Sequence, residues 1–235
     1  VSAGGRALVR NGNVVRYLSE DDQTVVLSLP DAPMTFGGRA RHMVENLLAA
    51  TGATLGLGLS IEDVSEGLRT FRSDLRSNAG RLNVFELDGR TIVVDYAHNE
   101  SGLEALIAFA RSLMPPEGRL AVIVGTAGDR QDSVFDALGR IAAEQADRVY
   151  IKENLNYLRG REAGEGTRLM RAGVERVGKT DRLGGVMQGE HDALLAALGW
   201  SSQGDAVAIM CLEEQLAVLR ELRHRGATEW GEAAP

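Results

Sequence analysis

From residue 83 onward the chain alternates short apolar runs with segments whose apolar residues recur every three or four positions. Runs such as "RTIVVDY" and "RLAVIVG" are rich in β-branched residues and predict buried strands, while the segments between them predict amphipathic helices. Strands that alternate with helices form a mostly parallel sheet covered on both faces. The sequence therefore predicts an α/β fold for this part of the chain.

This region is expected to open with two strands, "LNVFELDG" and "RTIVVDY", that turn at Asp88-Gly89. The predicted helices after them cover residues 101–113, 133–146, 165–177, 190–199 and 213–223. The predicted strands between these helices cover residues 119–125, 148–152, 183–187 and 206–212. We expect the segment after Arg225 to be frayed.

The first 77 residues predict a smaller unit, made of a β-hairpin and two helices. Asn11-Gly12 is a strong hairpin turn signal between two strand-like runs, and "TVVLSL" adds a further strand. A segment of helical period follows over residues 38–58, and Ser60, with Asp63 at the capping-box position, begins a second helix. Residues 72–81 are polar without apolar periodicity and predict a linker, so we place the domain boundary between residues 77 and 78.

Charge and cysteine content exclude several classes of function. The net charge of -7 argues against non-specific binding to nucleic acid, because no positive field attracts phosphates. The single cysteine, Cys211, excludes an internal disulfide and a cysteine-rich metal site, and its apolar neighbours predict a buried thiol. The longest mostly apolar run, residues 47–59, is too short to span a bilayer. We expect a cytoplasmic protein without membrane contact.

Polar side chains follow the predicted strand at residues 91–95, namely Asp95, Tyr96, His98 and Asn99. In open α/β sheets, ligands bind beyond the carboxyl ends of the strands, so a carboxylate here can bind ribose hydroxyls or orient a cation. The alternative is that Asn99 or Ser101 only caps the next helix, while Asp95 only supports the turn.

Two further strand ends carry polar loops. "GTAGDRQ", residues 125–131, has two glycines whose backbone amides can face an anion, with Arg130 as an additional donor; a plain turn is the alternative. Residues 152–166, "KENLNYLRGREAGEG", form a long loop in which Arg159 and Arg161 can clamp carboxylates; a solvated loop is the alternative.

Residues 173–180, "GVERVGKT", match the phosphate-binding pattern GxxxxGK[ST] letter for letter. A working loop of this type follows a strand and opens a helix, so that backbone amides converge on phosphate. Here the apolar period continues through Val174 and Val177, which places Gly178 at the end of a helix. We therefore interpret the match as coincidental. An independent phosphotransferase that uses Lys179 is the weakest hypothesis.

The order of several motifs resembles a known family. "PMTFGGRARHMVENLLAATGATLGLGLSIEDVSEGLRTFRSD", "AGRLNVFELDGRTIVVDYAHNESGLEAL", "GTAGDRQD" and "KENLNYLRGREAGEG" follow one another as in the C-terminal half of the Mur ligase superfamily. Within that superfamily the chain is most similar to the Mur-like module of cyanophycin synthetases. The resemblance implies that residues 1–77 are the end of a central ATPase domain and residues 78–235 a Rossmann-like C-terminal domain.

The resemblance also implies an activity. Members join an amino acid to a carboxylate, using ATP and Mg²⁺, through an acyl phosphate. The glycine-rich phosphate loop and most Mg²⁺ ligands are expected N-terminal to Val1, in cis or in trans, so the chain alone is expected to be inactive. A non-catalytic module that binds a nucleotide or an amino acid together with a partner chain is the alternative. The amino acid, the carboxylate acceptor and a homo-oligomeric state stay open.

Individual roles follow from the resemblance by position. The residues expected at the nucleotide are Asn46 near adenine, Arg81 near the phosphates, Asp95 at the ribose, His98 and Asn99. Among them, Arg81 and His98 are the expected catalytic residues. The residues expected at the incoming amino acid are Asp129, Arg130, Arg159 and Arg161. No residue of the chain is assigned as a metal ligand, because no histidine has ligand spacing around it.

Overall fold

The computed structural model describes residues 5–20 and 22–230. The chain forms two compact units, Val1–Ser73 and Asp74–Pro235. The division between them therefore falls inside the predicted linker, earlier than the boundary expected between residues 77 and 78.

The first unit is a three-stranded antiparallel sheet with two helices. Its strands are β1 (Ala7–Asn11), β2 (Val14–Leu18) and β3 (Gln23–Ser28), in the order β1-β2-β3. Gly12 has a φ of 59°, which is the left-handed conformation that the predicted hairpin turn requires. Two short 3₁₀ turns, Leu29–Asp31 and Pro33–Thr35, lead from the sheet into the helices.

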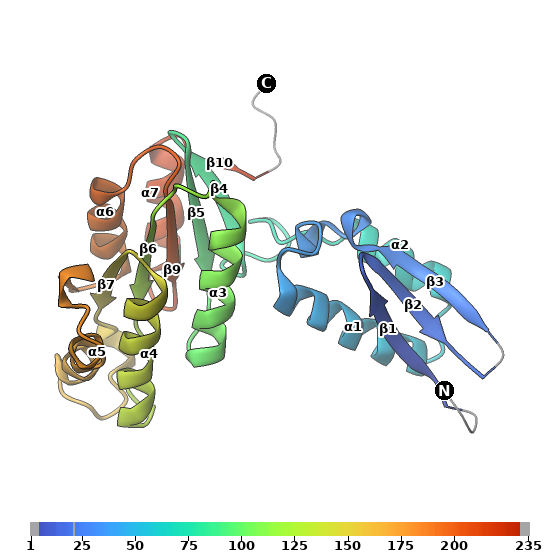
Figure 1. The fold of residues 1–235 in the computed structure, drawn as a ribbon, viewed down its shortest axis with the longest axis horizontal. Coiled ribbons are helices and arrows are strands. Elements are labelled where there is room, and N and C mark those ends of the chain that lie inside the picture. Colours follow the sequence, from blue (N-terminus) through green and yellow to red (C-terminus); the bar gives the residue numbers. More distant parts are fainter. Residues whose placement is uncertain (1–4, 21, 231–235) are drawn as a thin grey trace. The chain divides into compact units, whose positions relative to one another are not determined.

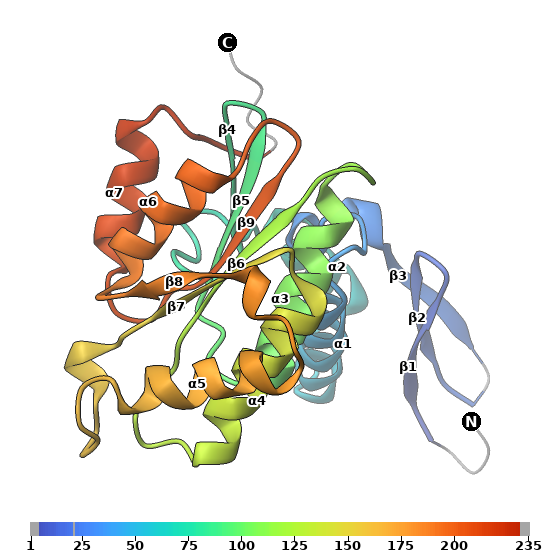
Figure 2. The ribbon, with the colours of Figure 1, turned by 60° about the vertical axis from the view of Figure 1, so that its left-hand side comes forward.

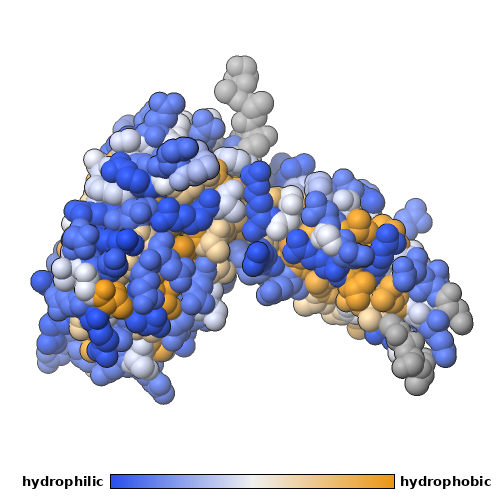
Figure 3. Space-filling model, in the orientation of Figure 1, coloured by the Kyte–Doolittle hydropathy of each residue, from blue (hydrophilic) through white to orange (hydrophobic). Residues whose placement is uncertain are grey.

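The helices of this unit are α1 (Arg41–Gly56) and α2 (Ile61–Thr70). Ser60 caps α2 as predicted, since its Oγ accepts a hydrogen bond from the Asp63 N–H over 3.1 Å. Apolar surface gathers on this unit in Figure 3. Leu57, directly after α1, is the most exposed large apolar side chain among the described residues of this unit, at 82%.

The second unit is built on a seven-stranded sheet in the order β10-β4-β5-β9-β6-β7-β8. The strands are β4 (Asn83–Leu87), β5 (Arg90–Asp95), β6 (Leu120–Val124), β7 (Arg148–Lys152), β8 (Leu183–Met187), β9 (Ala206–Met210) and β10 (Thr228–Glu229). β5, β9, β6, β7 and β8 are parallel, while β4 and β10 pair antiparallel at one edge. The predicted α/β fold with a mostly parallel sheet is confirmed.

Five helices cover the two faces of this sheet (Figures 1 and 2). They are α3 (Glu100–Leu113), α4 (Asp132–Gln145), α5 (Glu165–Arg176), α6 (Glu190–Trp200) and α7 (Gln215–His224). α3, α4 and α5 lie on one face, and α6 and α7 on the other (Figure 2). The helix bounds differ from the predicted ones by one or two residues.

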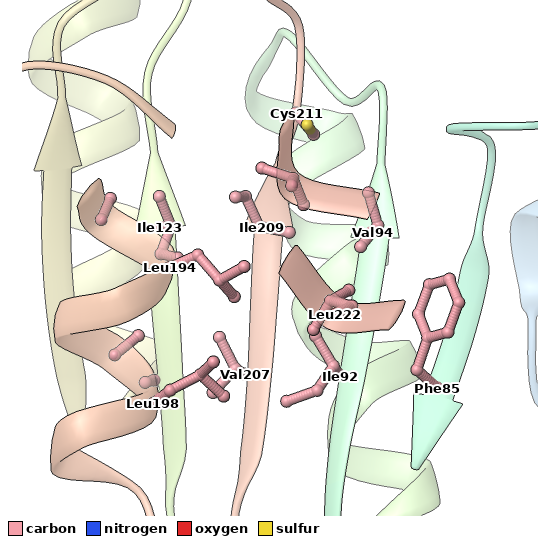
Figure 4. Packing of buried hydrophobic residues seen from close by; sticks show 14 of the residues in the cluster. Phe85, Ile92, Val94, Ile123, Leu194, Leu198, Val207, Ile209, Cys211 and Leu222 are labelled. Carbon is pink, nitrogen blue, oxygen red and sulfur yellow. The ribbon is translucent and has the colours of Figure 1, made fainter. Parts of the chain in front are cut away.

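Alternation along the strands divides the core between the two faces. Ile92 and Val94 of β5 and Val207 and Ile209 of β9 pack with Leu194 of α6 in one cluster (Figure 4). The residues between them, such as Val93 and Ala208, are also fully buried but point to the opposite face. Burial on both faces explains why these strands are continuously apolar in sequence.

One expectation about the ends of the second unit was wrong. The segment after Arg225 is not frayed throughout, because β10 pairs with β4 and the Trp230 N–H donates to the Val84 carbonyl. Residues 231–235 lie outside the described residues. The predicted linker also contacts this edge of the sheet, since the Leu75 N–H donates to Glu229 Oε2 over 3.1 Å.

The phosphate-loop pattern at residues 173–180 lies at the wrong end of a helix, as predicted. α5 ends at Arg176, and Gly178 follows with a φ of 67° and donates its N–H to the Glu175 carbonyl. The amides of this segment therefore terminate a helix instead of opening one. Among the described residues, no helix is long and apolar enough to cross a membrane.

Candidate functional site

The carboxyl ends of β5, β6, β7 and β9 meet at one edge of the sheet and are joined by hydrogen bonds. Thr126, after β6, donates its hydroxyl to the His98 carbonyl, after β5, over 2.8 Å. The Gly128 N–H donates to the Tyr157 carbonyl, after β7, over 2.7 Å. The Cys211 N–H, after β9, donates to the Asp95 carbonyl over 2.7 Å. The polar clusters predicted separately at these strand ends therefore form one continuous region.

The end of β5 holds the linker against the sheet. Asp95 Oδ2 accepts a hydrogen bond from the Leu82 N–H over 2.8 Å. The Arg81 guanidinium carbon lies 4.4 Å from the centre of the Tyr96 ring, which is a cation–π distance. A carboxylate, a guanidinium and a phenol are thus held together beside a parallel strand end, where they can contact a sugar and a phosphate.

His98 and Asn99 follow in the same turn. His98 Nδ1 lies 3.1 Å from the Tyr96 carbonyl and can donate to it as N–H, which leaves Nε2 as the acceptor of the neutral ring. Asn99 is the N-cap of α3, because its Oδ1 accepts from the Gly102 N–H over 2.8 Å. The alternative that Asn99 caps the next helix is therefore correct for its side-chain oxygen.

Arg161 ties the loop after β6 to the loop after β7. Its guanidinium donates to the carbonyls of Gly128 and Arg130, each over 2.7 Å. It also pairs with Asp132 and Glu165, and the guanidinium carbon lies 4.8 Å from the centre of the Phe135 ring. The Arg161 side chain is only 16% exposed, so its planar guanidinium group mainly holds the loops after β6 and β7 together.

Three of the other predicted residues lie on the surface of the second unit, and the fourth belongs to the first unit. Asp129 and Arg130 are exposed in the loop after β6, and Arg159 is exposed after β7 with its guanidinium carbon 5.4 Å from the Tyr157 ring centre. Asn46 belongs to the first unit, where it is exposed on α1.

A small cavity lies between the two loops, and Asn154, which lines it, was not singled out from the sequence. Asn154 is only 3% exposed, yet neither its Oδ1 nor its Nδ2 has a hydrogen-bond partner. It lines a cavity of about 10 Å³ together with Thr126, Gly128, Phe135, Glu153, Tyr157, Leu158, Arg161 and Gly166. A buried amide without a protein partner is costly, and a cavity of about 10 Å³ has room for about one water-sized polar group beside it.

A buried ion pair beside the cavity was also missed. Lys152, the last residue of β7, pairs with Glu190, the first residue of α6, and both side chains are essentially inaccessible. Burial lowers the pKa of Lys152. Burial alone opposes ionisation of Glu190, but Lys152 and the surrounding donors outweigh it and lower the pKa of Glu190. Only the rarity of lysine, with Lys152 and Lys179 alone in the chain, marked this position in the sequence.

The thiol predicted to be structural belongs to the same cluster. Cys211 is 1% exposed and donates to Glu190 Oε2 over 3.0 Å. Burial raises the pKa of the Cys211 thiol, which keeps the thiol protonated as a donor.

The side chains at the end of β5 include an acceptor and a cation. The half-buried carboxylate and the stacked guanidinium at the end of β5 offer the acceptor and the cation that a ribose and a phosphate need. By contrast, the described residues contain no group of three or more histidine, cysteine or acidic side chains able to hold a metal. The side chains at the end of β5 therefore have the chemistry to contact part of a nucleotide.

Comparison with known proteins gives the chain its relatives. The family model described as "Mur ligase, glutamate ligase domain" matches residues 80–211. A cyanophycin synthetase of Nostoc sp. is 34% identical over 89% of this chain, and one of Crocosphaera subtropica is 38% identical over 73%. The chain spans only 23% and 19% of these relatives' own lengths.

Solved structures agree with the fold. E. coli FolC in complex with ADP matches 93% of this chain with a TM-score of 0.63 at 16% identity, and this chain covers 46% of it. A pseudomurein peptide ligase type C from Methanothermus fervidus matches 92% of this chain with a TM-score of 0.60 at 16% identity, with 40% of that chain covered. The motif order, the family model and the identity to the cyanophycin synthetases agree, and the chain belongs to the Mur ligase family.

Proposed function

We propose that the chain is the C-terminal portion of a cytoplasmic ATP-dependent ligase that joins an amino acid to a carboxylate through an acyl phosphate. The observation that carries this proposal is the hydrogen bond between Thr126 and the His98 carbonyl. It joins a cluster suited to a nucleotide, at the end of β5, to a cavity with an unpartnered amide between the loops after β6 and β7. A ligase needs these two sites side by side. The carboxylate substrate takes the γ-phosphoryl group of ATP to form an acyl phosphate, and the amine then attacks this acyl phosphate and releases phosphate.

At the nucleotide side, Asp95 would accept hydrogen bonds from the ribose, and Arg81 would contact the phosphates. Arg81 is already stacked on Tyr96, so its charge is positioned before the nucleotide arrives. His98 Nε2 and the Asn99 amide would face the same ligand, with the ring of His98 oriented by the Tyr96 carbonyl. In the first unit, Asn46 would approach adenine. Arg81 would stabilise the developing phosphoryl charge, and His98 would do so once Nε2 also carries a proton, because the neutral ring offers only a lone pair there.

At the amine side, the polar contacts would come from the loops that Arg161 holds together. Asp129, Arg130 and Arg159 are exposed on these loops and can meet the charged groups of an amino acid. Asn154 joins them as a residue of the cavity wall, because its amide has both donor and acceptor capacity to offer. Arg161 would act by fixing the loops.

The remaining machinery would come from elsewhere in the ligase, in cis or in trans. ATP supplies the phosphoryl group, and Mg²⁺ supplies charge neutralisation at the phosphates when bound. Phosphoryl transfer depends on a backbone-amide cradle, and residues 173–180 do not provide one, since they end a helix. We therefore expect no appreciable ligase activity from these 235 residues alone.

Nucleotide titration tests this proposal on the chain itself. Addition of ADP at millimolar concentration to isotope-labelled protein is expected to shift the amide resonances of Leu82, Tyr96 and His98. The same titration of Arg81→Ala should give smaller shifts, while Arg176→Ala, on the far part of α5, serves as the matched arginine control. Shifts confined to residues 173–180 would contradict the proposal. Amino-acid-dependent ADP formation by the purified chain would contradict the claim that it is inactive alone.

A further inference from the structure

Glu190 is a buried carboxylate that accepts hydrogen bonds from two parts of the second unit, the end of β7 and the segment after β9. Besides Lys152 Nζ and the Cys211 thiol, it accepts the N–H groups of Leu212 over 2.6 Å, Glu213 over 3.0 Å and Glu214 over 2.7 Å. The N–H groups of three successive residues form the kind of concavity that binds anions. Here the anion is the protein's own carboxylate, which fixes the segment between β9 and α7.

Lys152 fixes the neighbouring loop from the other side. It is the last residue of β7, two positions before Asn154. Both side chains pack on Gly125, where an added Cβ would lie 2.7 Å from Lys152 Cε and 2.9 Å from Asn154 Oδ1. Glu213 accepts the Asn156 N–H over 3.1 Å and is bonded to its side-chain amide as well. The ion pair thus lies where the loops after β7 and β9 are fastened to each other.

Stability alone gives little reason for such a pair. Removing two charges from water carries a large desolvation penalty, and replacing a buried pair with apolar residues of similar size is often neutral or stabilising. A buried pair does, however, impose one geometry, because each partner tolerates few other positions. Binding sites are held to their working geometry by such supporting contacts.

We propose that Lys152 and Glu190 are a positioning pair for the amino-acid substrate: they hold the loops after β7 and β9 so that the Asn154 amide faces its cavity. This rests on the proposed function for the identity of the ligand, but the positioning itself is a property of the chain. Neither residue touches the substrate. The pair acts through Asn154 and through the Glu213–Asn156 contact.

Hydrogen–deuterium exchange on the 235-residue chain tests the positioning. The double variant Lys152→Met/Glu190→Gln removes both charges at similar volume and leaves no unpaired buried charge. The exchange rate of residues 153–164 and 211–214 is expected to rise at least about tenfold in this variant. Unchanged protection of both segments would overturn the proposal.

Asp205→Asn is the matched control. Asp205 is 5% exposed, pairs with Arg119 over 2.7 Å and accepts the Arg119 and Ser202 N–H groups, but it lies at the amino ends of β6 and β9. The Asp205→Asn variant should have a lower unfolding temperature, but the exchange rate of residues 153–164 should not rise. Equal opening of that loop in both variants would mean that any lost buried charge has this effect, and would also overturn the proposal.

Steady-state kinetics of the complete ligase that carries this segment test the consequence. The double variant is expected to raise KM for the amino acid at least about tenfold and to leave KM for ATP within about twofold, since a small misplacement near the reacting groups is costly. Asp205→Asn should change neither. A normal amino-acid KM together with opened loops would overturn the link to substrate. If the complete protein forms no amino-acid-dependent ADP, the proposed function fails, and the exchange experiment still decides the positioning.

Discussion

The N–H of Leu82 donates to Asp95 Oδ2 over 2.8 Å, although Leu82 is a branched residue with a φ of 52°. A left-handed conformation costs such a residue about 1–2 kcal/mol. Leu82 is also 1% exposed, so its N–H needs a partner inside the protein. The carboxylate proposed to meet the ribose therefore also stabilises a strained turn where the linker joins β4.

Substitution of Asp95 is expected to act on stability as well as on nucleotide contact. Asp95→Ala leaves the buried Leu82 N–H without this acceptor and should lower the free energy of unfolding by about 1–3 kcal/mol. Asp95→Asn retains an acceptor and should lose less stability, while KM for ATP of the complete ligase still rises. Urea unfolding of both variants beside Asp129→Ala, an exposed acid, measures this. An unchanged midpoint for Asp95→Ala would contradict it.

The two arginines of the loop after β7 are expected to behave differently. Arg161→Ala removes donors from two backbone carbonyls and should cost about 1–3 kcal/mol. Arg159 is exposed, and Arg159→Ala should change the free energy of unfolding by less than about 0.5 kcal/mol. Limited proteolysis of residues 126–132 should be faster only in Arg161→Ala. Similar losses in both variants would argue against a structural role specific to Arg161.

Lys179 is expected to be dispensable for nucleotide binding, because it follows the C-terminus of α5. Lys179→Ala should leave the ADP-induced shifts at residues 81–98 unchanged. Gly178→Ala, one position earlier, should instead destabilise the protein by about 1 kcal/mol, since an alanine does not readily adopt a φ of 67°. Thermal unfolding and ADP titration of the two variants check both statements. Loss of the ADP-induced shifts in Lys179→Ala would support the hypothesis of a phosphate-binding loop at residues 173–180.

Acid is expected to weaken the pair between Asp205 and Arg119. Burial opposes ionisation of Asp205, but the hydrogen bonds from Arg119 and from the Ser202 N–H outweigh it and lower the pKa of Asp205. A folded pKa below the unfolded value of about 3.9 means that the stabilisation is present above about pH 4 and is lost as the pH falls through the folded pKa.

Asp205→Asn should therefore cost about 1–3 kcal/mol at pH 7 and show a shallower loss of stability below about pH 4. Urea unfolding between pH 7 and about pH 3 measures both slopes. Parallel slopes for the variant and the unmodified protein would show that another group titrates in this range.

The chain end after Arg225 is expected to contribute to the fold. Deletion of residues 228–235 removes β10, the Trp230 contact with β4 and the acceptor of the Leu75 N–H. It should destabilise the second unit by about 1–3 kcal/mol, because each of these hydrogen bonds contributes about 1 kcal/mol or less. Deletion of residues 231–235 alone removes none of these contacts and is the control. Equal unfolding midpoints for the two deletions would count against a role for β10.

Much of the site was visible in the sequence because strand ends in a parallel sheet converge. Asp95, His98 and Asn99 at the end of β5 and the glycines after β6 could be placed at one edge from the strand–helix alternation alone. The Asn99 cap was visible as well, since an asparagine before a helical period is a common helix start. The sequence left open which of these polar groups form hydrogen bonds within the protein and which are free to contact a ligand. Arg161 illustrates this, since four of its bonds are to the protein.

The sequence by itself determined the elements and the order in which they occur, because hydrophobic period, turn residues and caps are local properties of the chain. It also determined the family, through several motifs in one order. Only the tertiary structure decided the pairing of β10 with β4, the ion pair between Lys152 and Glu190 and the unpartnered Asn154 amide. These depend on residues far apart in the chain, and on the space that packing leaves between them, which no local pattern encodes.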